Sequence, residues 1–293
     1  MNKLRSIEQI ITPPSPHMVG DGFWVHTFFP GGRTMNNERM SPFFLMDYNA
    51  KTDFHPTDKP RGVGVHPHRG FETVTIVYHG KVAHHDSAGN NGVIKEGDVQ
   101  WMTAASGVLH KEYHEEEFSR KGGLLQMVQL WVNLPSKYKM TPAKYQSLEN
   151  KDLMKVVLND GKSILELIAG EYNGIQGTAT TFSPVNLFNA KLIPGAKACF
   201  SFNRNFNTGI LVIEGEIKIN ESKTATENHF VLFSHDGEEI VIEAVNKSVV
   251  LILSGEPINE PIASYGPFVM NTEAEIRQAY EDFNNGKFGY LED

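Results

Sequence analysis

The sequence predicts an all-β protein with two domains and one helix near its C-terminal end. Beyond residue 140, short β-type runs recur at intervals of roughly 8–14 residues, a spacing typical of β-sandwiches and β-barrels. Turn residues, as at Gly80 and at 89–92, separate similar runs in the first half. The length of 293 residues is about twice that of an average domain. Together these observations favour two β-domains over one.

The first half begins with an extended, proline-rich segment, Met1–Pro16. Residues 31–39 are polar and residues 51–64 are rich in proline, glycine and charge, so we expect loops there, the second leading into His66. Leu124–Val132 is almost continuously apolar, as expected for a strand buried on both faces. Ser41–Tyr48 is apolar and expected to be buried, and the other expected strands are Phe23–Phe29, Glu72–Tyr78, Lys81–His85 and Val99–Thr103.

A polar stretch around Pro135, residues 134–141, is the predicted domain boundary. The N-terminal domain then covers residues 1–135 and the C-terminal domain residues 136–293. The expected strands of the C-terminal domain are Ser163–Ala169, Thr181–Phe188, Ala198–Phe202, Gly209–Ile213, Glu216–Ile219, Phe230–Phe233, Glu239–Ala244 and Val249–Leu253.

The C-terminal tail carries the signals of one amphipathic helix. Thr272 and Glu275 have the spacing of a capping box, in which a hydroxyl and a carboxylate satisfy the first backbone amides. Gly286 is a natural stop. Apolar residues follow the cap at helical spacing, at Ile276, Ala279, Tyr280 and Phe283. We therefore expect this helix to dock on a domain surface.

The charge, the cysteine content and the distribution of apolar residues restrict the partners and the compartment expected for this protein. The net charge of −8, without any cluster of lysine and arginine, disfavours nucleic acids and anionic membranes as partners. Cys199 is the only cysteine, so no intrachain disulfide can form, which fits a reducing compartment. The first residues are polar, and no apolar stretch approaches the ~20 residues of a membrane span. We expect a soluble, cytoplasmic protein, for which a monomer is compatible.

A weak internal repeat links the two halves. Residues 77–82 can be aligned with residues 212–217, at an offset of 135. Extended without gaps, this offset places Ser201 and Asn203 at the positions of His66 and His68, and Asn207 at that of Glu72. We interpret the halves as two copies of one β-barrel, of which only the first kept metal ligands; the alternative is two unrelated β-domains.

The candidate site lies in residues 65–114, which hold seven of the 12 histidines. His66 and His68 form a His-x-His pair, and His110, Glu112 and His114 are again spaced by two. Side chains two apart on a strand point to the same face, so each group can aim its donors at one point. A lone His-x-His pair could equally be two exposed loop histidines. The second cluster favours a metal site of three imidazoles and one carboxylate inside a barrel.

The spacing leaves the fourth ligand open between Glu72, Glu112 and His114. Glu72 lies four residues after His68, which on a straight strand is the same face. His84 and His85 are adjacent and should point to opposite faces, with a hydrogen-bonded or surface role expected. The ligand set excludes a cysteine-rich structural zinc site, and it leaves a divalent ion with open positions for a substrate oxygen and dioxygen.

Several motifs resemble those of the pirin family of bicupins. They are the run 66–75 (HPHRGFETVT), the pattern His84-Asp86-Ser87-Gly89-Asn90, the run 97–112 (GDVQWMTAASGVLHKE), residues 129–134 and 255–257, and the tail Gly266–Ile276. The resemblance runs in order over nearly the whole chain. It implies two cupin (double-stranded β-helix) barrels with a C-terminal helix, and a metal in the N-terminal barrel alone.

The resemblance also implies the ligands His66, His68, His110 and Glu112, with Glu72 left as a neighbour of the ligands. This sequence departs from the general cupin pattern at Ala105, where a proline is expected, and at His114. The ion would be one divalent transition metal, with iron favoured and nickel, copper, zinc, manganese and cobalt also compatible.

Two activities are known in the family. Some bacterial pirins resemble quercetin 2,3-dioxygenase, an oxidoreductase (quercetinase) that opens flavonols with O2 and loss of carbon monoxide. Eukaryotic members resemble iron-binding regulators that act through protein–protein contacts. We favour the dioxygenase because the site is intact, with a flavonol-like aromatic substrate, O2 as co-substrate, and Glu112 as the catalytic base. The alternative is a non-catalytic regulator with a protein partner.

Overall fold

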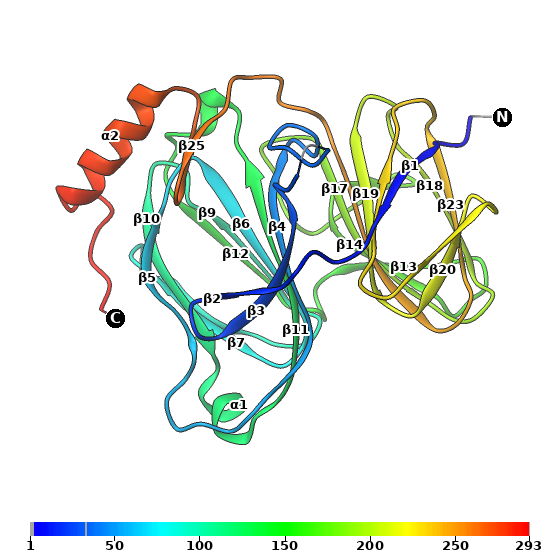
Figure 1. Cartoon of the computed structure of the whole chain (residues 1–293), viewed down its shortest axis with the longest axis horizontal. Coiled ribbons are helices and arrows are strands. Elements are labelled where there is room, and N and C mark those ends of the chain that lie inside the picture. Colours follow the sequence, from blue (N-terminus) through cyan, green and yellow to red (C-terminus); the bar gives the residue numbers. More distant parts are fainter. Residues whose placement is uncertain (1–2, 33, 293) are drawn as a thin grey trace. The chain divides into compact units, whose positions relative to one another are not determined.

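The structure, a computed structural model, describes residues 3–32 and 34–292. β-Strands dominate it (Figure 1). The chain forms two compact units, neither of which is one continuous segment. The histidine unit comprises Ser15–Asn37, Phe43–Asn150 and Ile258–Asp293, and the aliphatic unit comprises Met1–Pro14, Glu38–Pro42 and Lys151–Pro257.

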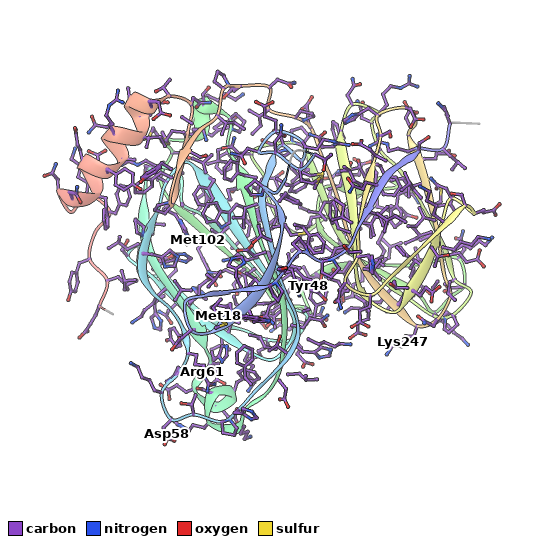
Figure 2. The ribbon with its side chains drawn as sticks, viewed as in Figure 1. Met18, Tyr48, Asp58, Arg61, Met102 and Lys247 are labelled. Atoms are coloured by element: carbon purple, nitrogen blue, oxygen red, sulfur yellow. The ribbon has the colours of Figure 1, made fainter. Side chains whose placement is uncertain are left out.

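The histidine unit contains β2 (His17–Val19), β3 (Phe23–Phe29), β4 (Phe43–Phe54), β5 (Gly62–His68), β6 (Phe71–His79), β7 (Val82–Asp86), β8 (Asn91–Ile94), β9 (Val99–Thr103), β10 (Val108–His114), β11 (Gly123–Asn133) and β12 (Lys144–Leu148). They form a seven-stranded sheet, β12-β9-β6-β11-β4-β3-β2, and a four-stranded sheet, β5-β10-β7-β8. Side-chain hydrogen bonds join β6 to β10 and β7 to β12, so the two sheets face each other. Met102, labelled in Figure 2, is buried between them.

The aliphatic unit contains β1 (Ile7–Ile11), β13 (Met154–Val157), β14 (Ile164–Ala169), β17 (Val185–Leu192), β18 (Lys197–Ser201), β19 (Asn207–Glu214), β20 (Glu216–Ile219), β21 (Lys223–Thr226), β22 (Phe230–Phe233), β23 (Glu239–Ala244) and β24 (Ser248–Gly255). A small hairpin joins β15 (Glu171–Tyr172) to β16 (Ile175–Gln176). Its sheets have the orders β1-β22-β19-β24-β17-β14-β13 and β18-β23-β20-β21. One apolar cluster, rich in isoleucine and phenylalanine, fills its interior.

The two units repeat one topology. Reading each sheet order from its first strand, β12 corresponds to β1, β9 to β22, β6 to β19, and β5 to β18. The edge strand of the aliphatic unit therefore comes from the N-terminal segment, whereas the edge strand of the histidine unit follows β11 in the chain. The compact units thus cut the chain differently from a division at residue 135. Strand β12 and the C-terminal helix belong to the histidine unit, and β1 belongs to the aliphatic unit.

The prediction of an all-β fold with a C-terminal helix is confirmed. Helix α2 (Glu273–Asn284) begins at Thr272, whose hydroxyl accepts a hydrogen bond from the Glu275 amide, and buries Ile276 and Ala279. It lies beside the hairpin of β25 (Ala263–Tyr265) and β26 (Phe268–Met270) (Figure 1). The sequence did not predict α1 (Glu116–Lys121), which Glu115 caps, or the 3-10 turn η1 (Ser136–Tyr138).

The predicted and observed limits coincide for some strands and differ by one to a few residues for others. β3, β9, β20, β22 and β23 have the predicted limits. The predicted loop over 51–64 is partly wrong, because β4 extends to Phe54 and β5 starts at Gly62. Pairing with β11 and β10 holds these ends in extended conformation despite their proline- and glycine-rich composition. None of the helices in the described ranges has the length and apolar character needed to cross a membrane.

The internal repeat is present in the structure, but its offset changes by one residue. Glu112 faces His84 across β10 and β7, as Ile242 faces Ile219 across β23 and β20. Two residues earlier on β10, His110 pairs with His66 of β5. Two residues earlier on β23, Ile240 pairs with Phe200 of β18.

Phe200, not Ser201, therefore stands where His66 stands. A slip of one residue moves a side chain to the opposite face, and Ser201 is exposed while Phe200 is buried. The prediction that Ser201 and Asn203 replace His66 and His68 is wrong for this reason.

Candidate metal centre

Three histidines converge inside the histidine unit. His66 and His68 lie two residues apart on β5, and His110 lies on the adjacent strand β10, directly opposite His66. The ring centroids of His66 and His110 are 4.2 Å apart, and those of His68 and His110 are 4.6 Å apart. One nitrogen from each ring lies within 4.8 Å of the others. The alternation of side chains along two neighbouring strands thus produces a three-imidazole cluster.

Hydrogen bonds orient two of these rings. Nδ1 of His66 lies 2.8 Å from the Gly64 carbonyl oxygen, and Nδ1 of His68 lies 3.4 Å from that of Pro267. Because a carbonyl can only accept, each Nδ1 carries the hydrogen and each Nε2 keeps a free lone pair. His110 is buried, and neither of its nitrogens has a hydrogen-bond partner among the described residues. An imidazole buried in this way needs another partner.

Burial also keeps the cluster neutral. It lowers the pKa of His66, and it lowers the pKa of His68 and of His110 well below the ordinary value, with neighbouring imidazoles adding to the effect. Neutral imidazoles are the form that binds transition metals. The donor set therefore fits a divalent transition metal, and the histidines are the residues that would hold it.

Glu112 lies on the same face of β10, two residues beyond His110, but its oxygens are not part of the three-histidine cluster. Thr75 donates a hydrogen bond to Oε1 (3.1 Å), and the Gln129 amide donates to Oε2 (2.8 Å). The Thr75 hydroxyl also lies 2.6 Å from Oε1 of Gln129. Burial raises the pKa of Glu112 to about 7, while the two hydrogen bonds act in the opposite direction. The structure thus places a restrained carboxyl group next to the histidines.

Glu72 does not share the face of His68. β5 ends at His68, the chain turns at Gly70 (φ +90°), and β6 begins at Phe71, so counting four residues along one strand does not apply. Thr75 of β6 contacts Glu112, and Glu72, three residues away, points to the other side of the sheet. There it accepts a hydrogen bond from Thr103 (2.7 Å). The expectation that Glu72 neighbours the ligands is therefore wrong.

His114 is excluded as the residue that completes the cluster. It shares a face with His110 but lies four residues further along β10. Its Nε2 lies 2.7 Å from the Gly22 carbonyl oxygen, and aromatic rings of Phe23, Phe54 and Phe118 surround it.

As expected, the adjacent pair on β7 divides between two faces: His84 is buried, and His85 bonds the hydroxyl of Tyr113 (3.0 Å).

A segment distant in sequence fixes the turn that follows His68. The Arg69 guanidinium pairs with Asp282 of α2 (2.8 Å) and donates to the Ser106 carbonyl oxygen (2.7 Å). Both partners of this ion pair are buried. Gly70 packs so closely on the Val269 carbonyl that a Cβ there would overlap it. The C-terminal segment therefore holds the backbone of the histidine pair.

Sequence reasoning missed four residues that support the site. Thr75 and Gln129 could have been found from the alternation of β6 and β11, since both face the interior. Arg69 and Asp282 gave no local signal, because they are separated by 213 positions. Ala105, where cupins carry proline, has φ +39°, a conformation that the proline ring forbids.

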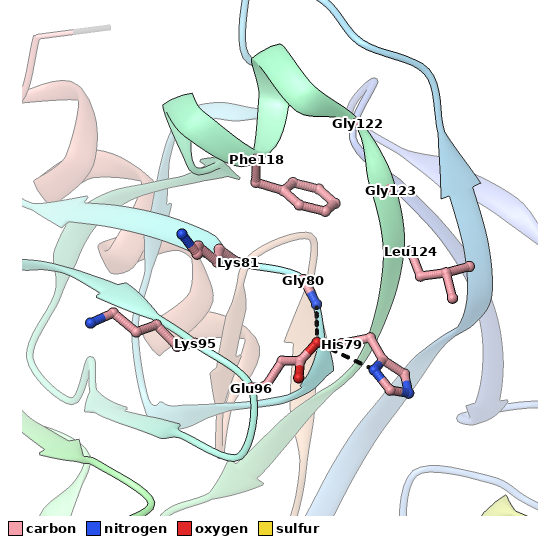
Figure 3. Close-up of a pocket in the computed structure, with 9 residues that line it drawn as sticks. All are labelled: His79, Gly80, Lys81, Lys95, Glu96, Phe118, Gly122, Gly123 and Leu124. Atoms are coloured by element: carbon pink, nitrogen blue, oxygen red, sulfur yellow. Dashed lines mark hydrogen bonds and ion pairs between the residues drawn. The ribbon is translucent and has the colours of Figure 1, made fainter.

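The other end of the interior is closed by apolar side chains, namely Phe23, Val25, Val77, Val82, Ile94, Phe118, Leu125 and Met127. A surface pocket lies beside this end (Figure 3). Its Glu96 carboxylate accepts a hydrogen bond from the Gly80 amide (3.4 Å) and pairs with His79 (3.3 Å). The three clustered histidines are not among the residues that line it, so it does not lead to the candidate metal centre.

Comparison with known proteins gives matches along the chain. The family model described as Pirin matches residues 25–132, and the model described as Pirin C-terminal cupin domain matches residues 187–289. A protein of Pseudomonas aeruginosa named "Putative quercetin 2,3-dioxygenase" is 48% identical over 93% of this chain and 94% of its own length. The human protein named Pirin is 36% identical over 86% of this chain and 84% of its own.

A solved structure gives the same result for the fold. The crystal structure titled quercetin 2,3-dioxygenase from Acinetobacter baumannii is 48% identical and covers 99% of this chain and 100% of its own, with a TM-score of 0.92. The two facing-sheet units are therefore cupin domains.

Proposed function

Because the chain belongs to the pirin family, whose models match both of its units, we propose that it is a metal-dependent dioxygenase of the quercetin 2,3-dioxygenase type. Its reaction opens a flavonol-like substrate with O2 and releases carbon monoxide. The observation that supports this most directly is the buried cluster of three neutral histidines with a restrained carboxyl group beside it. The names of relatives that are 48% identical point to the same chemistry.

We assign the metal to His66, His68 and His110, with Glu112 as the fourth ligand. Iron is the proposed metal, and nickel, copper, zinc, manganese and cobalt are compatible with the same donors. When bound, such an ion supplies Lewis acidity and electron transfer to dioxygen. Elemental analysis of the protein purified from its native host identifies the metal.

Glu112 is the proposed base. Its carboxylate lies next to the histidines and takes the proton of the substrate hydroxyl at one of its two oxygens. Thr75 and Gln129 hold the group in one orientation. Geometry comes before acidity in assigning a base. Glu112 shares the histidines' face and is held by side chains of the interior, whereas Asp86, which stands opposite His110, accepts hydrogen bonds from the turn at Ala88 and Asn90. The buried position excludes bulk water from the reacting groups.

Aerobic turnover tests the proposal. Protein loaded separately with iron, nickel, copper, cobalt or manganese is mixed with quercetin, and loss of flavonol absorbance is followed together with carbon monoxide release. We expect turnover with at least one metal, and none in the variant His110→Ala. The matched control is His85→Ala. His85 lies on the face of β7 that is opposite to that of the buried His84, so this variant should keep full activity. No turnover with any metal would exclude quercetin as substrate.

A metal-binding regulator without turnover predicts a different result. The protein would keep its metal, leave the flavonol unchanged, and bind a protein partner with an affinity that depends on the oxidation state of iron. Equal binding of the apo, ferrous and ferric forms would exclude this alternative.

A further inference from the structure

A second group of polar side chains lies inside the histidine unit and has no role in the proposed ligation. Gln100 on β9 stands directly opposite Thr75 in the β6–β9 register. Side chains of directly opposed residues share a face. Because Thr75 bonds Glu112, Gln100 faces the same interior space as Glu112.

Two further residues join Gln100 from other strands. His84 stands directly opposite Glu112 in the β7–β10 register. Its Nε2 lies 2.6 Å from the hydroxyl oxygen of Tyr145 on β12, and the two rings stack with centroids 4.9 Å apart. Tyr145 shares its face with Ser147, which pairs with Gln100. His84, Gln100 and Tyr145 therefore line one part of the interior, from both sheets.

The hydrogen-bonding capacity of this group is not used up within the protein. Gln100 is 1% exposed, and neither its amide oxygen nor its amide nitrogen has a hydrogen-bond partner among the residues that the structure describes. A buried amide without partners is costly, so such a group marks a place where another molecule binds. It offers one acceptor and a pair of donor hydrogens.

The fold does not require polar residues at these positions. In the aliphatic unit the residues that correspond to Thr75, His84, Gln100 and Glu112 are fully buried branched aliphatics, Ile210, Ile219, Val231 and Ile242. Gly92 gives a second indication. A Cβ at Gly92 would lie 3.0 Å from Nε2 of His84 and 3.5 Å from the Tyr145 hydroxyl, so the glycine keeps this pair uncrowded.

We propose that His84, Gln100 and Tyr145 form a subsite for a hydroxylated aromatic ring of the substrate, the ring remote from the hydroxyl that Glu112 deprotonates. This rests on the proposed function. A phenolic hydroxyl is both donor and acceptor, which matches the Gln100 amide. The side chains of Gln100 and Tyr145 carry no charge, and the neighbouring carboxyl groups of Glu112 and Asp86 disfavour an anion, so a neutral hydroxyl suits the subsite.

Binding without turnover tests the subsite. Zinc-loaded protein is titrated in the absence of oxygen with quercetin, which has hydroxyls on both outer rings, and with 3-hydroxyflavone, which lacks them. We expect Gln100→Leu to weaken quercetin binding about tenfold, the order of a lost hydrogen bond to a buried partner, and to change 3-hydroxyflavone binding less than about twofold. Tyr145→Phe should cause a smaller loss with the same selectivity.

The matched control is Gln146→Leu, the same substitution on the opposite face of β12, which should change neither affinity. Zinc content, measured for every variant, shows whether the metal centre is intact, and Tyr145→Phe decides the question if Gln100→Leu loses zinc. Equal weakening of both flavonols, or no change in either, would overturn the subsite. A wild-type protein that binds neither flavonol would instead overturn the proposed function.

Discussion

Two units with one strand order have interiors of opposite chemistry. Between the sheets of the histidine unit, Glu112 is held by Thr75 and Gln129, next to three histidines. At the corresponding positions of the aliphatic unit, isoleucines and phenylalanines form a continuous cluster. The replacements follow the register of each strand pair: Phe200 for His66, Ile240 for His110, Ile242 for Glu112, Ile210 for Thr75 and Ile252 for Gln129.

The comparison separates what the fold needs from what the site needs. Strand pairing and sheet order are the same whether the interior is polar or aliphatic, so the polar residues of the histidine unit do not specify the topology. Burying polar groups without full hydrogen bonding lowers stability. Their presence in one unit is therefore explained by binding, not by folding.

The two interiors also differ in the hydrogen bonding of a pair of corresponding threonines. In the aliphatic unit, the buried Arg5 donates to the hydroxyl of Thr208 (2.6 Å) and to three carbonyl groups, including that of Phe206. Thr208 corresponds to Thr73 of the histidine unit, whose buried hydroxyl has no partner among the described residues. A side chain of the protein thus satisfies the threonine hydroxyl in one unit, whereas no described residue does so in the other.

The largest expected effect comes from giving the histidine unit a residue of the aliphatic unit. We expect His110→Ile to reduce the metal content to background, because one of three converging donors is lost. The metal-free variant should unfold at the same or a higher temperature than metal-free wild type, since an unpartnered buried imidazole is removed. Elemental analysis and thermal unfolding measure both. Retention of the metal would contradict the assignment.

The next effect concerns the ion pair that ties α2 to the histidine turn. Asp282→Asn leaves the buried Arg69 guanidinium without its countercharge and should lower the free energy of unfolding by about 3–4 kcal/mol. It should also weaken metal binding about tenfold or more, because Arg69 follows His68 directly. Denaturant unfolding and metal titration measure the two effects. Glu281→Gln, an exposed neighbour on α2, is the control; equal effects of both variants would contradict the role of the pair.

The sequence predicted the positions of site residues correctly where those residues lie on regular, uninterrupted strands. His66, His68 and His110 lie on uninterrupted strands, and alternation alone placed their donors together. The prediction failed at Glu72 because the turn at Gly70 resets the alternation, and at Ser201 because one residue more separates β18 from β19 than the gapless repeat assumes. The pairing of Arg69 with Asp282 depends on tertiary contact and leaves no periodic pattern.

A smaller effect should appear as a pH dependence at Glu72, which is 1% exposed. Burial raises its pKa to about 7 from an ordinary value of 4.5, so the folded protein keeps a proton that the unfolded chain releases. Stability from this group is full below about pH 4.5 and is lost as pH rises to about 7. Its counterpart, Asn207, is an uncharged amide that bonds Ser41 and His235.

Glu72→Gln should remove this pH dependence of stability, because it places an uncharged amide where the aliphatic unit has Asn207. We expect equal stability of variant and wild type near pH 4.5, and a variant more stable by about 3 kcal/mol at pH 8. Denaturant unfolding at the two pH values gives the difference. A constant difference across this range would show that Glu72 is ionised in the folded protein.

The smallest expected effect concerns helix α2 of the histidine unit, which has no counterpart among the described residues of the aliphatic unit. Thr272→Ala removes the acceptor of the Glu275 amide and should cost about 1 kcal/mol. Because Asp282 lies on the same helix, fraying should also speed hydrogen exchange in the turn after His68. Thr224→Ala, an exposed threonine of β21, is the control and should leave that turn unchanged. Faster exchange in α2 alone would mean that the Arg69 pair holds the turn independently of the helix start.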